Sequence, residues 1–132
     1  MKAGEKDLGR AYFKENKGFF WGLVETRPFM RAKKGYAEMS EFLGDFPEAA
    51  KHYEELLILN PDDNQGVRYL LLGVYCQLKK YDQANRLLKT YPEDSAFGTY
   101  DCLLVEFGLH GISGTMKSLL QAAKQSNPHV IP

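Results

Sequence analysis

The sequence predicts an all-α fold made of three helical hairpins, and two observations support this prediction. A set of positions recurs along the chain at intervals of a little over thirty residues, and such a period is typical of stacked helical repeats. Between the turns, apolar residues recur at spacings of three and four, as a buried helical face requires. No stretch alternates with a period of two for long enough to suggest a strand.

The repeat begins at a turn that is followed by a small residue. Residues 44–49 read Gly-Asp-Phe-Pro-Glu-Ala, and Asn60-Pro61 closes the same repeat. Related turns begin 35 residues later, at 79–84, and another 32 residues later, at 111–116. The helices that precede these turns keep the same register, which favours a true repeat over a chance similarity.

We therefore expect a single domain over residues 1–132, with hairpins at about 26–61, 63–91 and 95–127 after an N-terminal helix and an apolar segment within 1–25. The N-terminal helix should span about residues 5–15. Thr26 is expected to cap the first long helix, with Pro28 in its first turn, where no hydrogen-bond donor is lost. Asp63 or Asn64 is expected to cap the helix that follows Pro61.

The two ends of the chain raise the question of self-association. Residues 18–24 are the most apolar stretch and include Phe19, Phe20 and Trp21. They predict either a hydrophobic plug on the first hairpin or a surface for a partner or a second copy. At the other end, residues 129–132 provide no polar terminal helix, which solenoids normally need. This favours either a homodimer through that end or a chain that is part of something longer.

Charge and composition exclude several classes of function. The chain has 17 basic and 17 acidic residues, so no sustained basic surface indicates a nucleic-acid partner. No apolar run approaches the roughly 20 residues that cross a bilayer, and the first residues lack the pattern of a signal peptide. Two cysteines, Cys76 and Cys102, are too few for a disulfide framework. Together these features predict a cytoplasmic protein with reduced thiols.

Enzymatic and metal-binding motifs are not found in the sequence. His52, His110 and His129 are far apart, and none has a second ligand at a spacing typical of metal sites. The glycines form no phosphate-binding loop between a strand and a helix. We therefore predict no catalytic residues, no metal and no cofactor.

Two stretches carry a family resemblance over nearly the whole chain. Residues 18–32 read Gly-Phe-Phe-Trp-Gly-Leu-Val-Glu-Thr-Arg-Pro-Phe-Met-Arg-Ala, and residues 60–70 read Asn-Pro-Asp-Asp-Asn-Gln-Gly-Val-Arg-Tyr-Leu. They resemble a bacterial tetratricopeptide-containing family of unassigned function that is related to eukaryotic suppressor-of-tumorigenicity proteins. The resemblance implies a right-handed superhelix of three hairpins and a role in protein interaction. The usual aromatic residue early in the first helix of each repeat is replaced by Lys33 and Arg68.

In tetratricopeptide arrays the first helix of each hairpin lines a concave groove, and the resemblance transfers this geometry to the present chain. The expected function is an adaptor that holds a peptide segment of an unidentified partner protein in the groove. The alternative is a structural module that forms a homo-oligomer through its hydrophobic ends. The expected groove residues are Arg31, Lys34, Glu38 and Phe42 from the first hairpin, Tyr69, Cys76 and Gln77 from the second, and Asp101 and Val105 from the third.

Arginines at two turns suggest a possible polar site. Arg27 and Arg68 could recognise an anion or an acidic motif, because guanidinium groups bind carboxylates bidentately. Alternatively, Arg27, Arg31 and Arg68 pair with Glu25 or Asp63 and fasten adjacent hairpins together.

Overall fold

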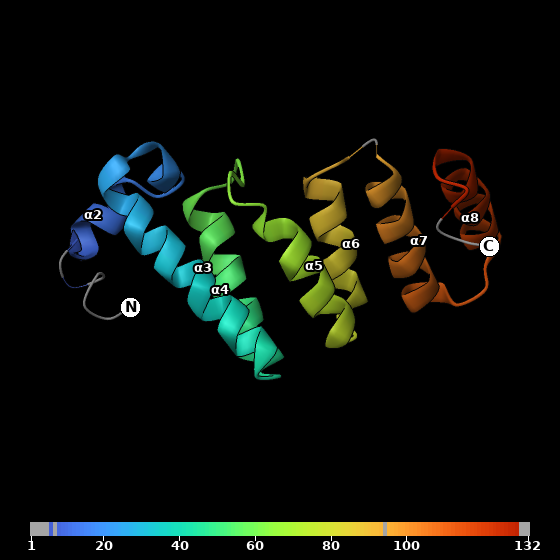
Figure 1. Ribbon diagram of the computed structural model, residues 1–132, viewed down its shortest axis with the longest axis horizontal. Helices are drawn as coiled ribbons and strands as arrows, with labels where there is room; N and C mark the ends of the chain where they lie inside the picture. The colour runs from blue at the N-terminus through green and yellow to red at the C-terminus, as the bar shows by residue number, and fades with distance from the viewer. Residues whose placement is uncertain (1–5, 7, 94, 130–132) are drawn as a thin grey trace. The chain divides into compact units, whose positions relative to one another are not determined.

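A computed structural model describes residues 6, 8–93 and 95–129, and these residues form helices and turns without a strand (Figure 1). The all-α prediction is confirmed. Consecutive long helices are joined by turns. The elements are α2 (Arg10–Glu15), η1 (Phe20–Gly22), η2 (Val24–Thr26), α3 (Arg27–Phe42), α4 (Phe46–Leu59), α5 (Val67–Gln77), α6 (Tyr81–Thr90), α7 (Ala96–His110) and α8 (Gly114–Ser126).

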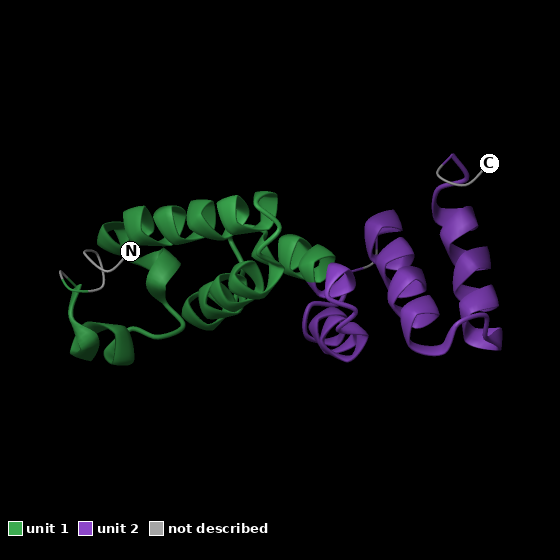
Figure 2. Ribbon diagram, turned by 90° about the horizontal axis from the view of Figure 1, so that it is seen from below, with its two compact units in different colours: residues 1–74 green, residues 75–132 purple. Residues whose placement is uncertain are grey.

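The chain divides into two compact units, Met1–Val74 and Tyr75–Pro132, and the boundary falls within α5 (Figure 2). Unit 1 contains α2, η1, η2, α3, α4 and the first part of α5. Unit 2 contains the end of α5 and the helices α6, α7 and α8. In the part of the chain that the structure describes, no helix is long and apolar enough to cross a membrane.

The α3/α4 hairpin provides much of the core of unit 1. Ala37 of α3 and Ala49 of α4 are fully buried, and such small side chains allow helix axes to approach closely. Around them, Met30, Tyr53 and Leu56 fill the interior. The carboxylate of Asp45 accepts a hydrogen bond from the backbone N–H of Glu48, which caps α4.

The N-terminal part of unit 1 packs an aromatic cluster against this hairpin. The buried ring of Phe20 lies 4.8 Å from that of Phe13, which in turn meets the ring of Phe29 edge-on at 5.2 Å. Two predictions fail here. The helix expected over 5–15 is interrupted at Gly9, whose φ of 77° is not helical, so α2 begins at Arg10. Thr26 does not cap α3, because its hydroxyl donates instead to the carbonyls of Phe20 and Leu23.

The start of α5 follows the prediction for Asp63. One oxygen of its buried carboxylate accepts from the N–H of Val67 at 2.6 Å, and the other accepts from the N–H of Arg68 at 3.1 Å. These two bonds satisfy backbone donors that a helix start leaves free.

Unit 2 depends on a close approach between α6 and α7. A Cβ atom at Gly108 would lie 2.3 Å from the ring of Tyr81, so only glycine fits there without a shift. The hydroxyls of Ser95 and Ser113 cap α7 and α8 by accepting from the N–H groups of Gly98 and Met116. The α7 and α8 helices then form the C-terminal hairpin of this unit (Figure 2).

Candidate functional site

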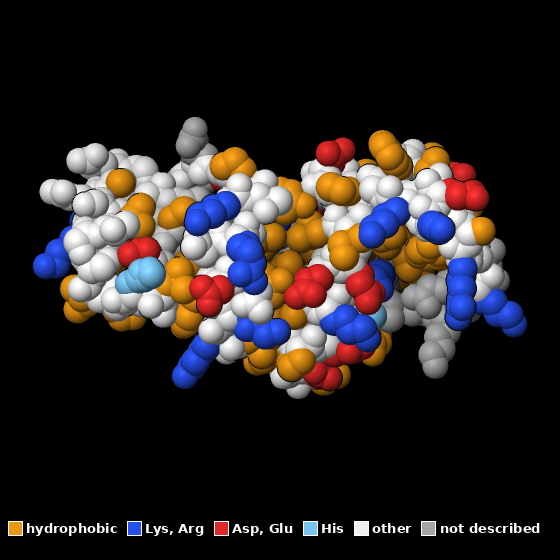
Figure 3. Space-filling view, turned by 180° about the vertical axis from the view of Figure 1, so that it is seen from behind, with side chains coloured by type: hydrophobic (Ala, Val, Ile, Leu, Met, Phe, Trp, Pro, Cys, Tyr) orange, Lys and Arg blue, Asp and Glu red, His pale blue; other side chains and the backbone are white. Residues whose placement is uncertain are grey.

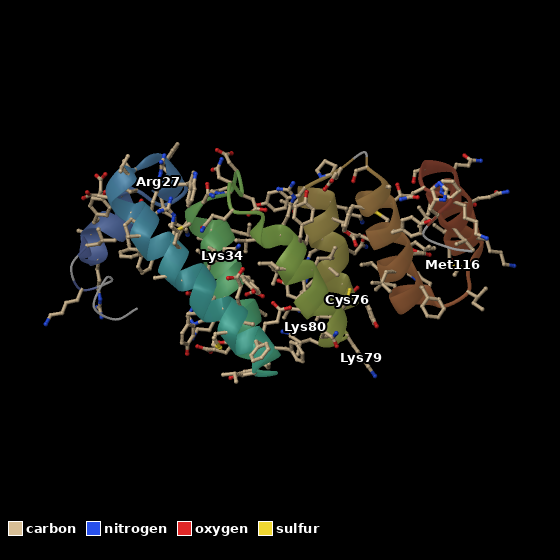
Figure 4. All side chains as sticks on the ribbon, in the orientation of Figure 1. Arg27, Lys34, Cys76, Lys79, Lys80 and Met116 are labelled. Atoms are coloured by element: carbon tan, nitrogen blue, oxygen red, sulfur yellow. The ribbon has the colours of Figure 1, made fainter. Side chains whose placement is uncertain are left out.

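The predicted groove residues of α3 lie along one side of that helix. Arg31, Lys34, Glu38 and Phe42 are spaced by three or four residues, which places them in a row. The ammonium of Lys34, labelled in Figure 4, lies 3.0 Å from the carboxylate of Glu38. At the end of the row, the side chain of Phe42 is 84% exposed. This row therefore offers an exposed arginine, an ion pair and an aromatic ring to a ligand.

Tyr69 is exposed on α5, and Arg68 fixes its side chain. The guanidinium carbon of Arg68 lies 4.4 Å from the centre of the Tyr69 ring, and its Nη2 donates to the Tyr69 hydroxyl at 2.7 Å. A second nitrogen, Nη1, pairs with Asp63 at 3.1 Å. The pair of Arg68 and Asp63 that the fastening interpretation includes is therefore present. It lies at the start of α5, however, and does not link one hairpin to another.

The predicted groove residues of unit 2 form a less exposed set. Val105 is only 2% exposed, so the expectation that it lines a groove is wrong: its side chain lies in the interior of unit 2. Asp101 is half-buried, and burial raises the pKa of its carboxyl, to which the charge of Glu93 adds. Gln77 is exposed at the end of α5.

The two cysteines are free thiols on α5 and α7. Burial, followed by the charge of Asp101, raises the pKa of both Cys76 and Cys102. A thiol with a raised pKa is a poor nucleophile at neutral pH. Among the described residues, no group of three or more His, Cys, Asp or Glu side chains is arranged to hold a metal ion.

The apolar N-terminal segment, residues 18–24, is only partly buried. Phe20 is buried, so it does not form part of an exposed self-association surface as one of the interpretations required. Trp21 is half-buried beneath two cations, with Arg27 at 5.4 Å and Arg31 at 6.0 Å from its ring centre. Arg27 also donates from Nε to the carbonyl of Trp21 at 2.9 Å. Phe19, at 74% exposure, and Val24, at 69%, remain available on this segment.

A pocket beside α2 was not foreseen from the sequence. It has a volume of about 760 Å³ and lies entirely within unit 1. Its walls combine aromatic and aliphatic side chains with basic ones. The lining residues are Lys6, Gly9, Arg10, Phe13, Phe29, Lys33, Glu55, Ile58 and Leu59.

Lys33 joins this pocket to a buried polar network between α3 and α4. Its ammonium forms an ion pair with Glu55 and lies 3.0 Å from Nδ1 of His52. On its other side, Nε2 of His52 lies 2.9 Å from Glu48, and this hydrogen bond lowers the pKa of the Glu48 carboxyl. The sequence contained one sign of this network: Lys33 occupies a position where tetratricopeptide repeats usually have an aromatic residue.

Comparison with known proteins agrees with this architecture. Residues 43–98 match the family model of the tetratricopeptide repeat, and this span includes α4, α5 and α6. Tetratricopeptide repeats generally mediate protein–protein interaction. Searches against curated proteins and against solved structures gave no match.

Proposed function

We propose that this chain is a non-catalytic adaptor of the cytoplasm that binds a peptide segment of a partner protein along α3 and the start of α5. The observation that carries this proposal is the row of Arg31, Lys34, Glu38 and Phe42, which ends in a phenylalanine that is 84% exposed. An exposed aromatic ring gains more from burial on binding than other exposed side chains, and aromatic and arginine residues are common at interaction hot spots.

The match to the tetratricopeptide repeat supports this proposal, because repeats of this kind bind other proteins. So does the resemblance of residues 18–32 and 60–70 to a bacterial family with the same repeat. The exposed guanidinium of Arg31 favours an acidic side chain of the ligand, since arginine binds carboxylates through two parallel hydrogen bonds. Phe42 and Tyr69 favour apolar ligand side chains.

The test is affinity co-purification from the source cell with a matched pair of variants. Phe42→Ser removes the proposed contact, whereas Phe19→Ser removes an equally exposed phenylalanine from the N-terminal segment. The partner should be lost with Phe42→Ser and kept with Phe19→Ser, and the purified partner should show the same difference. If both variants retain the same partners, the site on α3 is refuted.

The second candidate function is self-association through the apolar ends, and the exposure of Phe19 and Val24 favours it. Because a homo-oligomer of this kind loses contact area when an exposed ring is removed, Phe19→Ser should lower the molar mass in light scattering. A mass that corresponds to the monomer at every concentration of the intact chain would exclude this function.

A further inference from the structure

The pocket beside α2 combines apolar walls with a basic mouth. Phe13 and Phe29 form an edge-on aromatic pair on one side, and Ile58 and Leu59 of α4 form the other. Ile58 is half-exposed, so part of this apolar wall is in contact with water. A volume of about 760 Å³ lies within the range of ligand pockets. Burial of further apolar surface here would stabilise a complex.

The charges at the pocket do not balance. Three cations, from Lys6, Arg10 and Lys33, face the single carboxylate of Glu55. Lys33 is 2% exposed and already paired with that carboxylate, so these two charges offset each other. Lys6 and Arg10 are exposed, and no ion pair is found for either among the described residues. The charges that the described residues place at the mouth of the pocket are therefore positive.

We propose that this pocket binds a peptide segment in which one or two bulky apolar side chains are followed directly by an acidic residue. The apolar side chain lies between the Phe13–Phe29 pair and Ile58, and the carboxylate pairs with Arg10 and Lys6. The positive mouth selects the acid, and the apolar walls select the neighbouring leucine or phenylalanine. A polypeptide is the favoured source of this chemistry, because α4, which lines part of the pocket, lies within the span that matches the tetratricopeptide repeat, and repeats of this kind bind other proteins.

This pocket is distinct from the binding face proposed above and extends the function beyond it. Successive residues of an α-helix are rotated by about 100°. Phe29 and Lys33, which line the pocket, therefore lie on roughly the opposite side of α3 from Arg31 and Glu38. One hairpin thus has two separate binding faces, and each can be removed without touching the other.

The isoleucines provide a direct measurement. The sequence contains three: Ile58 lines the pocket, Ile112 lies in unit 2, and Ile131 lies outside the described residues. We would label isoleucine methyl groups with ¹³C, assign them with Ile→Val variants, and titrate the full chain with the peptide Ac-Gly-Ser-Leu-Phe-Asp-Asp-Ser-Gly-NH₂. The Ile58 methyl signal should shift and saturate, and the Ile112 signal should stay in place.

Matched controls separate charge from apolar contact. The same peptide with Asn-Asn in place of Asp-Asp should bind about fivefold more weakly or worse, and so should Arg10→Glu with the acidic peptide. Arg86→Glu makes the same charge change on α6 of unit 2, outside both proposed binding sites, and should alter the affinity less than about twofold. Both sites are exposed, so neither variant removes a core contact.

Several outcomes would overturn the proposal. These are an Ile58 signal that does not move at about 1 mM peptide, equal affinity for the acidic and amide peptides, or an equal effect of the two charge reversals. Decanoate serves as a further probe, because it has an apolar chain and a carboxylate but no peptide backbone. Saturable binding of decanoate without binding of the peptide would assign the pocket to a small amphipathic acid instead.

Discussion

The hairpins at the two ends of the described repeat differ in what they bury. The α3/α4 hairpin of unit 1 buries side chains along the whole of both helices, and the α7/α8 hairpin of unit 2 buries only Gly98, Val105 and Ala123. The difference does not follow from composition. The α7 sequence is rich in apolar residues, yet Phe97, Leu104 and Phe107 are exposed on it, and Figure 3 shows such hydrophobic side chains at the surface among charged ones.

The comparison shows that the burial of a side chain depends more on the neighbouring groups that can contact it than on its own hydrophobicity. Lys33 and His52 are buried in unit 1 because each finds hydrogen-bonding or ionic partners across the hairpin. Phe97 stays exposed because none of the described elements of unit 2 covers it. The α3/α4 hairpin is therefore expected to contribute more to stability than the α7/α8 hairpin.

The largest effect should come from truncating one leucine in each hairpin. Leu56→Ala removes a side chain that is almost fully buried in α4 and should lower the free energy of unfolding by about 3 kcal/mol. Leu120→Ala removes a half-buried side chain of α8 and should cost about 1 kcal/mol. Urea unfolding followed by circular dichroism gives both values. Equal losses would contradict the contrast between the two hairpins.

A smaller pair of effects, of opposite sign, is expected at two glycines within helices. Gly108→Ala places a Cβ atom 2.3 Å from the ring of Tyr81, which must shift, so it should destabilise unit 2 by about 1–2 kcal/mol. Gly35→Ala on α3 meets open space and should stabilise by up to about 1 kcal/mol through helix propensity. Thermal unfolding of the two variants provides the check. A stabilising Gly108→Ala would show that the α6–α7 approach is loose.

The smallest expected effect is a decrease of stability at alkaline pH that originates at Tyr53 in unit 1. Burial, then the hydrogen bond and the negative charge of Glu41, raise the pKa of Tyr53 above its ordinary value near 10. The folded protein thus retains this proton when the unfolded chain has lost it. The contribution of Tyr53 to the free energy of unfolding is therefore fully present below about pH 10 and declines at higher pH. Replacing the tyrosine by Tyr53→Phe should flatten this decline in urea unfolding at pH 9–11, and an unchanged slope would contradict the assignment.

Most of the fold could be predicted because local signals and the repeat agree. The recurring turn at Gly44 and the small residue Ala49 predict the hairpins, and Asp63 predicts a helix start. The failures at Gly9 and Thr26 have separate local causes. Gly9 takes a positive φ that interrupts the helix, and the hydroxyl of Thr26 donates to the carbonyls of Phe20 and Leu23.

The candidate site was less predictable than the fold. A helical period identifies which residues share a side of α3, so the row from Arg31 to Phe42 could be inferred from sequence alone. The pocket depends on how α2 lies against α3 and α4, and residue spacing carries no information on that. The burial of Val105 could not be predicted for the same reason. Residue spacing places Val105 on one side of α7 but does not show which side of that helix is covered.

Helical repeats are often treated as interchangeable cassettes that can be duplicated, deleted or replaced by a consensus copy. The Lys33 network makes the α3/α4 hairpin an exception. Its lysine is compatible with the interior only together with His52 and Glu55 on the following helix, so α3 and α4 must be inherited or grafted as a pair. A chimera that carries α3 on a consensus second helix would bury an ammonium group without its counter-charge.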